Sequence, residues 1–390
     1  MPKVAAAGTA ATLLALVCPA DASAQSATPA AAPSPLRLGL GGYFQAYGVF
    51  VSQPDGPGEY GADRRSFDIK REAEIFFSGR VRLDNGLTVG VQVELEAETC
   101  SDQIDESYLF FEGGWGRIVI GAENSPAYLL SLGPPTVDSS FDGIDANLFV
   151  VNALGSGPRS RAPDSWIVNL SGDSEKLSYF SPRIAGFQFG VAYTPDNSEE
   201  ATAGQVRAKG GAFAGMPSTR QSTDARGSWS DVLSAAVAYR ERFGPVRIGG
   251  SVSYERGTLS KCPAGVACGA YDDRQAWAAY VRADYAGFDL GAGYWEDDNG
   301  LRGANKSSGW GGALTYTTGP WTLGTSYFDG RRQLPGQEDD RMQRVLVGGL
   351  YQLGPGVDLR ASLHWYGFDS DKPTARGDSW AVVTGTVVRF

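Results

Sequence analysis

Apolar and polar residues alternate with a period of two along most of the chain after residue 36. The segment 246–255 reads VRIGGSVSYE, so one face carries Val, Ile, Val and Tyr, and the other carries Arg, two Ser and Glu. The segment 67–83 repeats the pattern with Arg71 as an exception, and the alternation recurs at 87–98, 187–194, 288–295, 310–317, 357–364 and 380–390. This period predicts β-strands with one apolar and one polar face.

The connections between these segments are short and long in turn. The short ones are 84–86, 113–116, 183–186, 244–245, 286–287, 318–320 and 354–356. The long ones are 52–64, 99–105, 124–175, 195–229, 259–273, 297–308, 331–340 and 367–378. These seven short and eight long connections separate sixteen strands.

Two architectures use such strands. A soluble sandwich buries the apolar faces between two sheets, whereas a membrane barrel turns them to lipid and keeps a polar lumen. Short turns at one end, long loops at the other and an even strand number favour the barrel. Trp380 and the terminal Phe390 lie ten residues apart on one face, which corresponds to roughly 25 Å of height, the spacing of two aromatic girdles. We therefore predict an all-β fold, a 16-stranded antiparallel transmembrane β-barrel.

The third long connection, 124–173, lacks the alternation. It contains five prolines, apolar anchors such as Leu130 and Phe141, and acids at Asp138, Asp142 and Asp145. Long loops in compact folds are usually functional or disordered, and the apolar anchors argue against disorder. We expect this loop to fold into the lumen; the alternative is an exposed surface loop.

The N-terminus has the features of a targeting segment. Lys3 precedes an apolar run, and Ala22-Ser23-Ala24 fits a cleavage site. The run is shorter than the ~20 residues that a spanning helix needs. We expect a signal peptide at 1–24, a flexible Ala- and Pro-rich leader at 25–35, and the barrel at 36–390.

The chain is acidic, with 34 Lys and Arg, 44 Asp and Glu, and a formal net charge of −10. This argues against nucleic-acid binding, which needs a basic surface. Carboxylates that line a pore favour cations, although most of these acids fall in long loops. Clusters at 272–273, 296–298 and 338–340 offer oxygen ligands for Ca²⁺ or Mg²⁺, with solvated acids as the simpler interpretation. We expect no other cofactor.

Three cysteines remain if Cys18 leaves with the signal peptide. Cys262 and Cys268 flank five residues in one loop, and an exported chain meets an oxidising compartment, so we expect a disulfide between them. Cys100 is left over. A zinc site would need four ligands, and the sequence offers no others here, so we predict no structural metal.

Catalysis has one candidate constellation. Ser362 and the single histidine, His364, are neighbours on one strand face. That face also carries Asp358 and Arg360, so the pair points into the lumen. Because a motif without context is weak evidence, we interpret His364 as a pore-lining polar residue and expect no enzyme activity.

The ordered strands, the long third loop and the terminal aromatic together resemble a family. The segments 67–98, 115–128 and 379–390 (SWAVVTGTVVRF) are similar to those of Gram-negative general outer-membrane porins of the alphaproteobacterial type. The resemblance implies a homotrimer whose third loop forms an eyelet, with Phe390 as the terminal aromatic of the assembly signal. It also implies an arginine cluster opposite the loop. Here that wall is mixed, with Lys70, Arg80 and Arg82 beside Glu72, Glu74, Glu94, Glu96 and Glu98.

We therefore expect a passive outer-membrane channel for small hydrophilic solutes and ions. Asp138, Asp142 and Asp145 would set a weak cation preference against the basic wall residues Lys70, Arg80, Arg82, Arg247 and Arg360; failing these acids, Glu72, Glu74 and Glu94 are the candidates. Expected partners are outer-membrane lipid and lipopolysaccharide. The runner-up is a substrate-selective porin for sugars or organic acids, with an aromatic track of Tyr43, Tyr47, Tyr280 and Trp295. A non-channel adhesin or lipid-binding barrel would not conduct across a bilayer.

Overall fold

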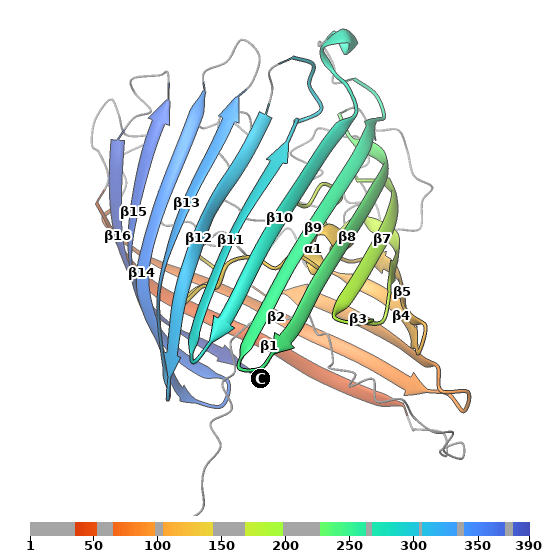
Figure 1. Cartoon of the computed structure of the whole chain (residues 1–390), viewed down its shortest axis with the longest axis horizontal. Helices are drawn as coiled ribbons and strands as arrows, with labels where there is room; N and C mark the ends of the chain where they lie inside the picture. Colours follow the sequence, from red (N-terminus) through yellow and green to blue (C-terminus); the bar gives the residue numbers. More distant parts are fainter. Residues whose placement is uncertain are drawn as a thin grey trace, which may run out of the picture.

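The chain folds into one closed β-barrel, as the computed structural model shows (Figure 1). The structure describes residues 36–52, 65–97, 104–142, 168–197, 227–262, 267–303, 306–333, 339–370 and 377–390. The predicted signal peptide, the leader, Glu98, Cys100, Asp145 and Glu338 lie outside these ranges. The predictions of sixteen strands, an antiparallel barrel and an inward third loop are confirmed.

Each strand pairs antiparallel with its neighbours in the sequence, and β1 pairs with β16 to close the barrel. At the seam, Gly42 and Phe390 exchange two backbone hydrogen bonds of 3.1 Å. The strands are β1 (Arg37–Ser52), β2 (Phe67–Arg82), β3 (Thr88–Glu96), β4 (Ser107–Gly113), β5 (Gly116–Ala122), β6 (Glu175–Phe180), β7 (Phe187–Asp196), β8 (Trp229–Phe243), β9 (Val246–Leu259), β10 (Arg274–Tyr285), β11 (Phe288–Asp297), β12 (Lys306–Thr318), β13 (Trp321–Gln333), β14 (Asp340–Gly354), β15 (Val357–Ser370) and β16 (Gly377–Arg389).

Two short helices accompany the strands in the described ranges, α1 (Pro126–Leu129) inside the barrel and η1 (Cys268–Ala270) in an outer loop. Ser125 caps α1, and Pro126 occupies its first turn, where a missing N–H costs nothing. No helix in the described part of the chain is long and apolar enough to span a membrane.

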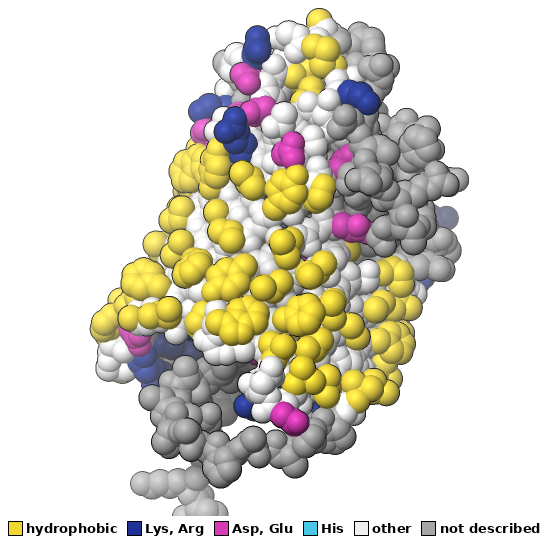
Figure 2. All heavy atoms as spheres, turned by 90° about the vertical axis from the view of Figure 1, so that its right-hand side faces the viewer, with side chains coloured by type: hydrophobic (Ala, Val, Ile, Leu, Met, Phe, Trp, Pro, Cys, Tyr) yellow, Lys and Arg dark blue, Asp and Glu magenta, His cyan; other side chains and the backbone are white. Residues whose placement is uncertain are grey.

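The outer surface is apolar, because the period-two alternation sends Val, Leu and aromatic side chains outward. Figure 2 shows them as a broad band, with charged side chains mainly above and below it. Aromatic pairs edge this band. Phe187–Tyr239, Phe288–Tyr316 and Trp321–Tyr351 lie near the short turns, with ring centroids 4.5–4.6 Å apart. Trp277–Tyr294 and Trp310–Tyr327 lie nearer the long loops. These are the two girdles of a membrane barrel.

Candidate functional site: the lumen and its folded loop

The first half of the third loop follows the inner wall at a constant height. It meets Gly190, Gly249, Gly291, Gly324 and Arg360 on alternate strands from β7 to β15. Each of these residues lies four positions after the end of a short turn. The five turns end at residues 186, 245, 287, 320 and 356. Four residues of a strand tilted by about 40° rise roughly 10 Å. The loop therefore crosses the lumen in the half of the barrel nearer the short turns.

Glycines make room for this path. A Cβ atom on Gly291 would lie 2.9 Å from Pro135 Cδ and 3.0 Å from Pro134 Cα. On Gly249 it would lie 2.9 Å from Leu132 Cδ1, and on Gly190 it would lie 2.9 Å from Pro126 Cβ. Because protein interiors are close-packed, side chains at these positions would displace the loop from the wall.

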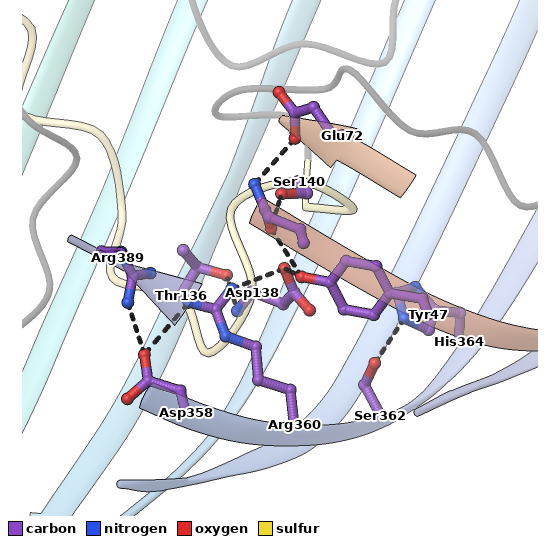
Figure 3. Close-up of polar contacts among 11 residues, drawn as sticks. Tyr47, Glu72, Thr136, Asp138, Ser140, Asp358, Arg360, Ser362, His364 and Arg389 are labelled. Atoms are coloured by element: carbon purple, nitrogen blue, oxygen red, sulfur yellow. Dashed lines mark hydrogen bonds and ion pairs between the residues drawn. The ribbon is translucent and has the colours of Figure 1, made fainter. Parts of the chain in front are cut away.

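Asp138 anchors the far end of this path (Figure 3). Its carboxylate accepts a hydrogen bond from Arg360 Nη1 at 2.9 Å and one from the Tyr47 hydroxyl at 3.2 Å. The same hydroxyl lies 2.7 Å from Gln45 Oε1, so its single hydrogen is shared between the two acceptors, and Gln45 Nε2 donates to Glu72 at 2.8 Å. The network joins the loop to β1, β2 and β15.

Asp142 makes a second anchor on the neighbouring strands. Its carboxylate lies 3.4 Å from Arg344 Nη2 and accepts a 2.7 Å hydrogen bond from Ser326. Arg344 also donates to the backbone carbonyl of Asp142. Sequence reasoning missed Arg344, although the alternation of β14 places it on the same inward face as Asp340 and Met342.

The arrangement of these acids differs from the expectation that they line the throat. The side chains of Asp138 and Asp142 are 2% and 1% exposed, sandwiched between loop and wall. Burial raises the pKa of both carboxyls, and the guanidinium groups of Arg360 and Arg344 oppose the rise. Paired and covered, they hold the loop in place and are screened from a passing ion. Asp145 lies outside the described residues.

A different set of carboxylates lies on the inward face of β3, away from the anchors of the loop. Glu94 and Glu96 of β3 are partly exposed on the inward face, with Asp105 near the long-loop end. Among the described residues, Glu74, Glu96 and Asp105 form the one group whose carboxylate oxygens lie within 4.8 Å of one another, a spacing that a divalent cation can bridge.

Two more carboxyls lie at the root of the third loop. Glu106 precedes β4, and Glu123 follows β5. Burial and the charges of nearby carboxylates raise the pKa of Glu106 well above its usual value. Burial also raises the pKa of Glu123, although Arg117 and Lys176 oppose the rise. Crowding therefore disfavours the ionised form of each of these carboxyls.

The predicted basic wall residues lie in three environments: in ion pairs with acids of the wall, in a buried ion pair with the loop, and exposed near a short turn. Lys70 lies beside Asp68 at 2.5 Å, and Arg247 beside Asp284 at 2.8 Å. Arg360 is the counter-charge of Asp138, as its inward position on β15 led us to expect. Arg80 and Arg82 are exposed near the short turn after β2.

The proposed aromatic track is mostly covered. Tyr47, Tyr280 and Trp295 are buried. Tyr47 packs edge-on against Phe141 of the loop, and Tyr280 and Trp295 share a cluster with Leu132. Tyr43 donates a 2.7 Å hydrogen bond to Glu72. Tyr47, Tyr280 and Trp295 therefore pack against the loop and are covered by it, whereas Tyr43 contacts β2.

Ser362 and His364 do face the same way, as predicted. Ser362 Oγ lies 2.8 Å from His364 Nε2, and the Tyr366 hydroxyl lies 3.3 Å from Nδ1. His364 is fully buried, with Phe141 of the loop against its ring. The histidine therefore lies beneath the loop, which differs from the expected pore-lining position.

The outer loops hold the remaining predicted features. Cys262 and Cys268 form a disulfide with Cα atoms 5.4 Å apart. The acids of the loop clusters have local partners: Asp273 pairs with Arg256, Glu296 with Lys306, and Asp297 with Arg274. Asp298 accepts backbone N–H bonds from Gln275 and Gly300.

Comparison with known proteins places the barrel in a family. A family profile described as Gram-negative porin matches residues 10–371. Among solved structures, the anion-selective porin from Comamonas acidovorans is 16% identical, with 91% of this chain and 100% of that chain covered and a TM-score of 0.56. The trimer form of OmpT from Vibrio cholerae is 10% identical, with 91% and 99% covered and a TM-score of 0.58. OmpF of Salmonella typhi, in a complex with daunomycin, is 16% identical, with 90% and 97% covered and a TM-score of 0.56. No curated protein gives a significant match.

Proposed function

Because the chain belongs to the Gram-negative porin family and forms an outer-membrane channel for small solutes, we propose that its weak ion preference is for cations and comes from the wall of β2 and β3. Passage is by diffusion through the water-filled space between the loop and this wall. The solutes are small and hydrophilic, since the lumen is lined by polar side chains.

The observation that carries the proposal is the different state of the two sets of acids. Asp138 and Asp142 are buried against arginines, whereas Glu94 and Glu96 remain partly exposed on the inward face of β3. An ion in the lumen therefore meets the wall carboxylates directly. Fixed carboxylates along a pore favour cation entry.

Substitution of the wall acids tests this assignment. Glu94→Gln with Glu96→Gln should lower the cation/anion permeability ratio by roughly 1.4- to fivefold for each carboxylate removed, since one partly solvated charge interaction is worth about 0.2–1 kcal/mol. The ratio is read from the reversal potential of single channels under a salt gradient. The matched comparison is Asp138→Asn with Asp142→Asn, which removes the same number of carboxylates from the loop.

The loop variant should change the cation/anion permeability ratio less than the wall variant does. It should increase the fluctuations of the open-channel current more. A larger loss of cation preference in the loop variant than in the wall variant would show that the eyelet acids control selectivity. Equal effects of the two variants would also reject the assignment to the wall.

We also propose a homotrimer exported with a cleaved signal peptide. Arg71 supports the first part: it is exposed on the outer face of β2, between apolar neighbours. A charge there is costly in lipid, and a second subunit would cover it. The OmpT structure similar to this chain is a trimer form.

Lys3 and the Ala22-Ser23-Ala24 site support the proposed export with a cleaved signal peptide.

Lipopolysaccharide is the lipid partner that we propose. Arg331 and Arg341 stand on the outer face above the aromatic girdle, with side chains 57% and 37% exposed. Both pair with the buried Asp329, which fixes their orientation and leaves further donors free. Guanidinium groups suit phosphate oxygens, and lipid phosphates occupy this height.

A further inference from the structure

Charge along the lumen changes sign from one end to the other. The short turns mark one end of the barrel and the long loops mark the other, which in outer-membrane barrels are the periplasmic and extracellular ends. Inward residues can therefore be placed in height by their distance along a strand from the nearest short turn.

Arginines dominate the inner surface near the short turns. Arg82 precedes the first turn, Arg183 lies in the third, and Arg240 and Arg242 precede the fourth at 244–245. In the described part of the chain, these four make no salt bridge. Arg183 and Arg282 lie close enough to Arg240 to act on it electrostatically. Arg282 is paired with Asp289 at 2.5 Å.

Carboxylates dominate the inner surface towards the long loops. Glu94 and Glu96 lie eight and ten residues beyond Gly86 of the first turn, about twice the height of the loop path. Asp105 adds a carboxylate at the same end. Two of the cations on this side have local acidic partners: Lys70 pairs with Asp68, and Arg274 with Asp297.

We propose that the lumen is a bipolar channel, whose acidic extracellular half admits cations and whose basic periplasmic half admits anions, so that it rectifies ionic current. The inference rests on the proposed open channel. When the extracellular side is positive, cations enter through the acidic half and anions through the basic half, and both ions accumulate at the junction. When that side is negative, each ion meets repulsive walls first, and the junction is depleted.

Single-channel recordings at opposite voltages test the proposal. In about 0.1 M KCl, where the Debye length is ~10 Å and wall charges act across the lumen, the current should be ~1.5 times larger with the extracellular side positive. In about 1 M KCl, where the Debye length is ~3 Å, the two currents should become equal. The orientation of the inserted channel is determined with an Asn85→Cys substitution in a Cys100→Ser chain, biotinylated at this short turn. Streptavidin lowers the current only when it is added to the chamber that the periplasmic end faces.

A pair of variants assigns the effect to the arginines. Arg240→Gln with Arg242→Gln should bring the current ratio at low salt close to one and raise the cation/anion permeability ratio. The matched control, Arg256→Gln with Lys306→Gln, removes two cations from the outer face and should leave the current ratio unchanged.

Equal currents at low salt, or larger currents with the extracellular side negative, would overturn the inference. So would a current ratio that the Arg240 and Arg242 substitutions leave unaltered. A protein that inserts without conducting would overturn the proposed function as well, whereas a conducting channel with symmetric currents would overturn the inference alone. The salt dependence of the unsubstituted protein keeps the test decisive if the variant fails to fold.

Discussion

Asp138 and Arg360 form the contact on which the position of the loop most depends. They lie 222 residues apart in the sequence and are both nearly inaccessible to solvent. Removal of one member of a buried ion pair leaves the other charge desolvated and unpaired, which is more costly than the loss of both. Asp358, at 3.7 Å from Arg360, would compensate only in part.

We therefore expect Asp138→Asn to lower the free energy of unfolding by about 3 kcal/mol. Arg360→Gln should have a similar effect, and the double variant should lose less than the sum of the two. Guanidinium unfolding midpoints of the three variants measure this coupling. Additive losses would mean that the pair contributes no interaction energy of its own.

At the scale of elements, the contact between loop and wall depends on where glycines fall in the strands. Gly190, Gly249, Gly291 and Gly324 occupy equivalent positions four residues beyond short turns. The loop fills the space that their missing side chains leave. Gly291 is the most sensitive position, because its neighbours are two prolines with little freedom to move away.

Gly291→Val should push the loop off the wall and into the open passage. We expect a lower single-channel conductance and a loss of about 1–3 kcal/mol of stability from overpacking. Gly79→Val is the matched control, since a Cβ at Gly79 meets Val91 and Leu38 at 3.5 and 3.6 Å, ordinary contact distances. An unaltered conductance in the Gly291 variant would show that the loop does not depend on this wall.

At the scale of the whole molecule, the period-two pattern and the alternating connection lengths were enough to predict the barrel and its strand number. Both are local properties of the sequence. Arg360 could likewise be placed on the inward face. Which acid it meets could not be predicted, because 222 residues separate the two partners and the path of the loop decides the contact.

The same reason explains why Asp138 and Asp142 lie against the wall and do not line the throat as expected. Asp138 and Asp142 were assigned to the throat from their spacing in the loop, but side-chain direction there depends on packing against β13, β14 and β15. Arg344 and the repeated glycine position were present in the sequence as signals. They gain meaning only once the loop is known to run along the wall.

The central claim is an open channel that retains a weak cation preference although its loop acids are covered. Planar-bilayer recording of the unsubstituted protein under a KCl gradient addresses this claim in one experiment. We predict discrete steps of conductance and a reversal potential displaced modestly towards that of potassium. Insertion without conductance steps, or a reversal potential displaced towards that of chloride, would contradict it.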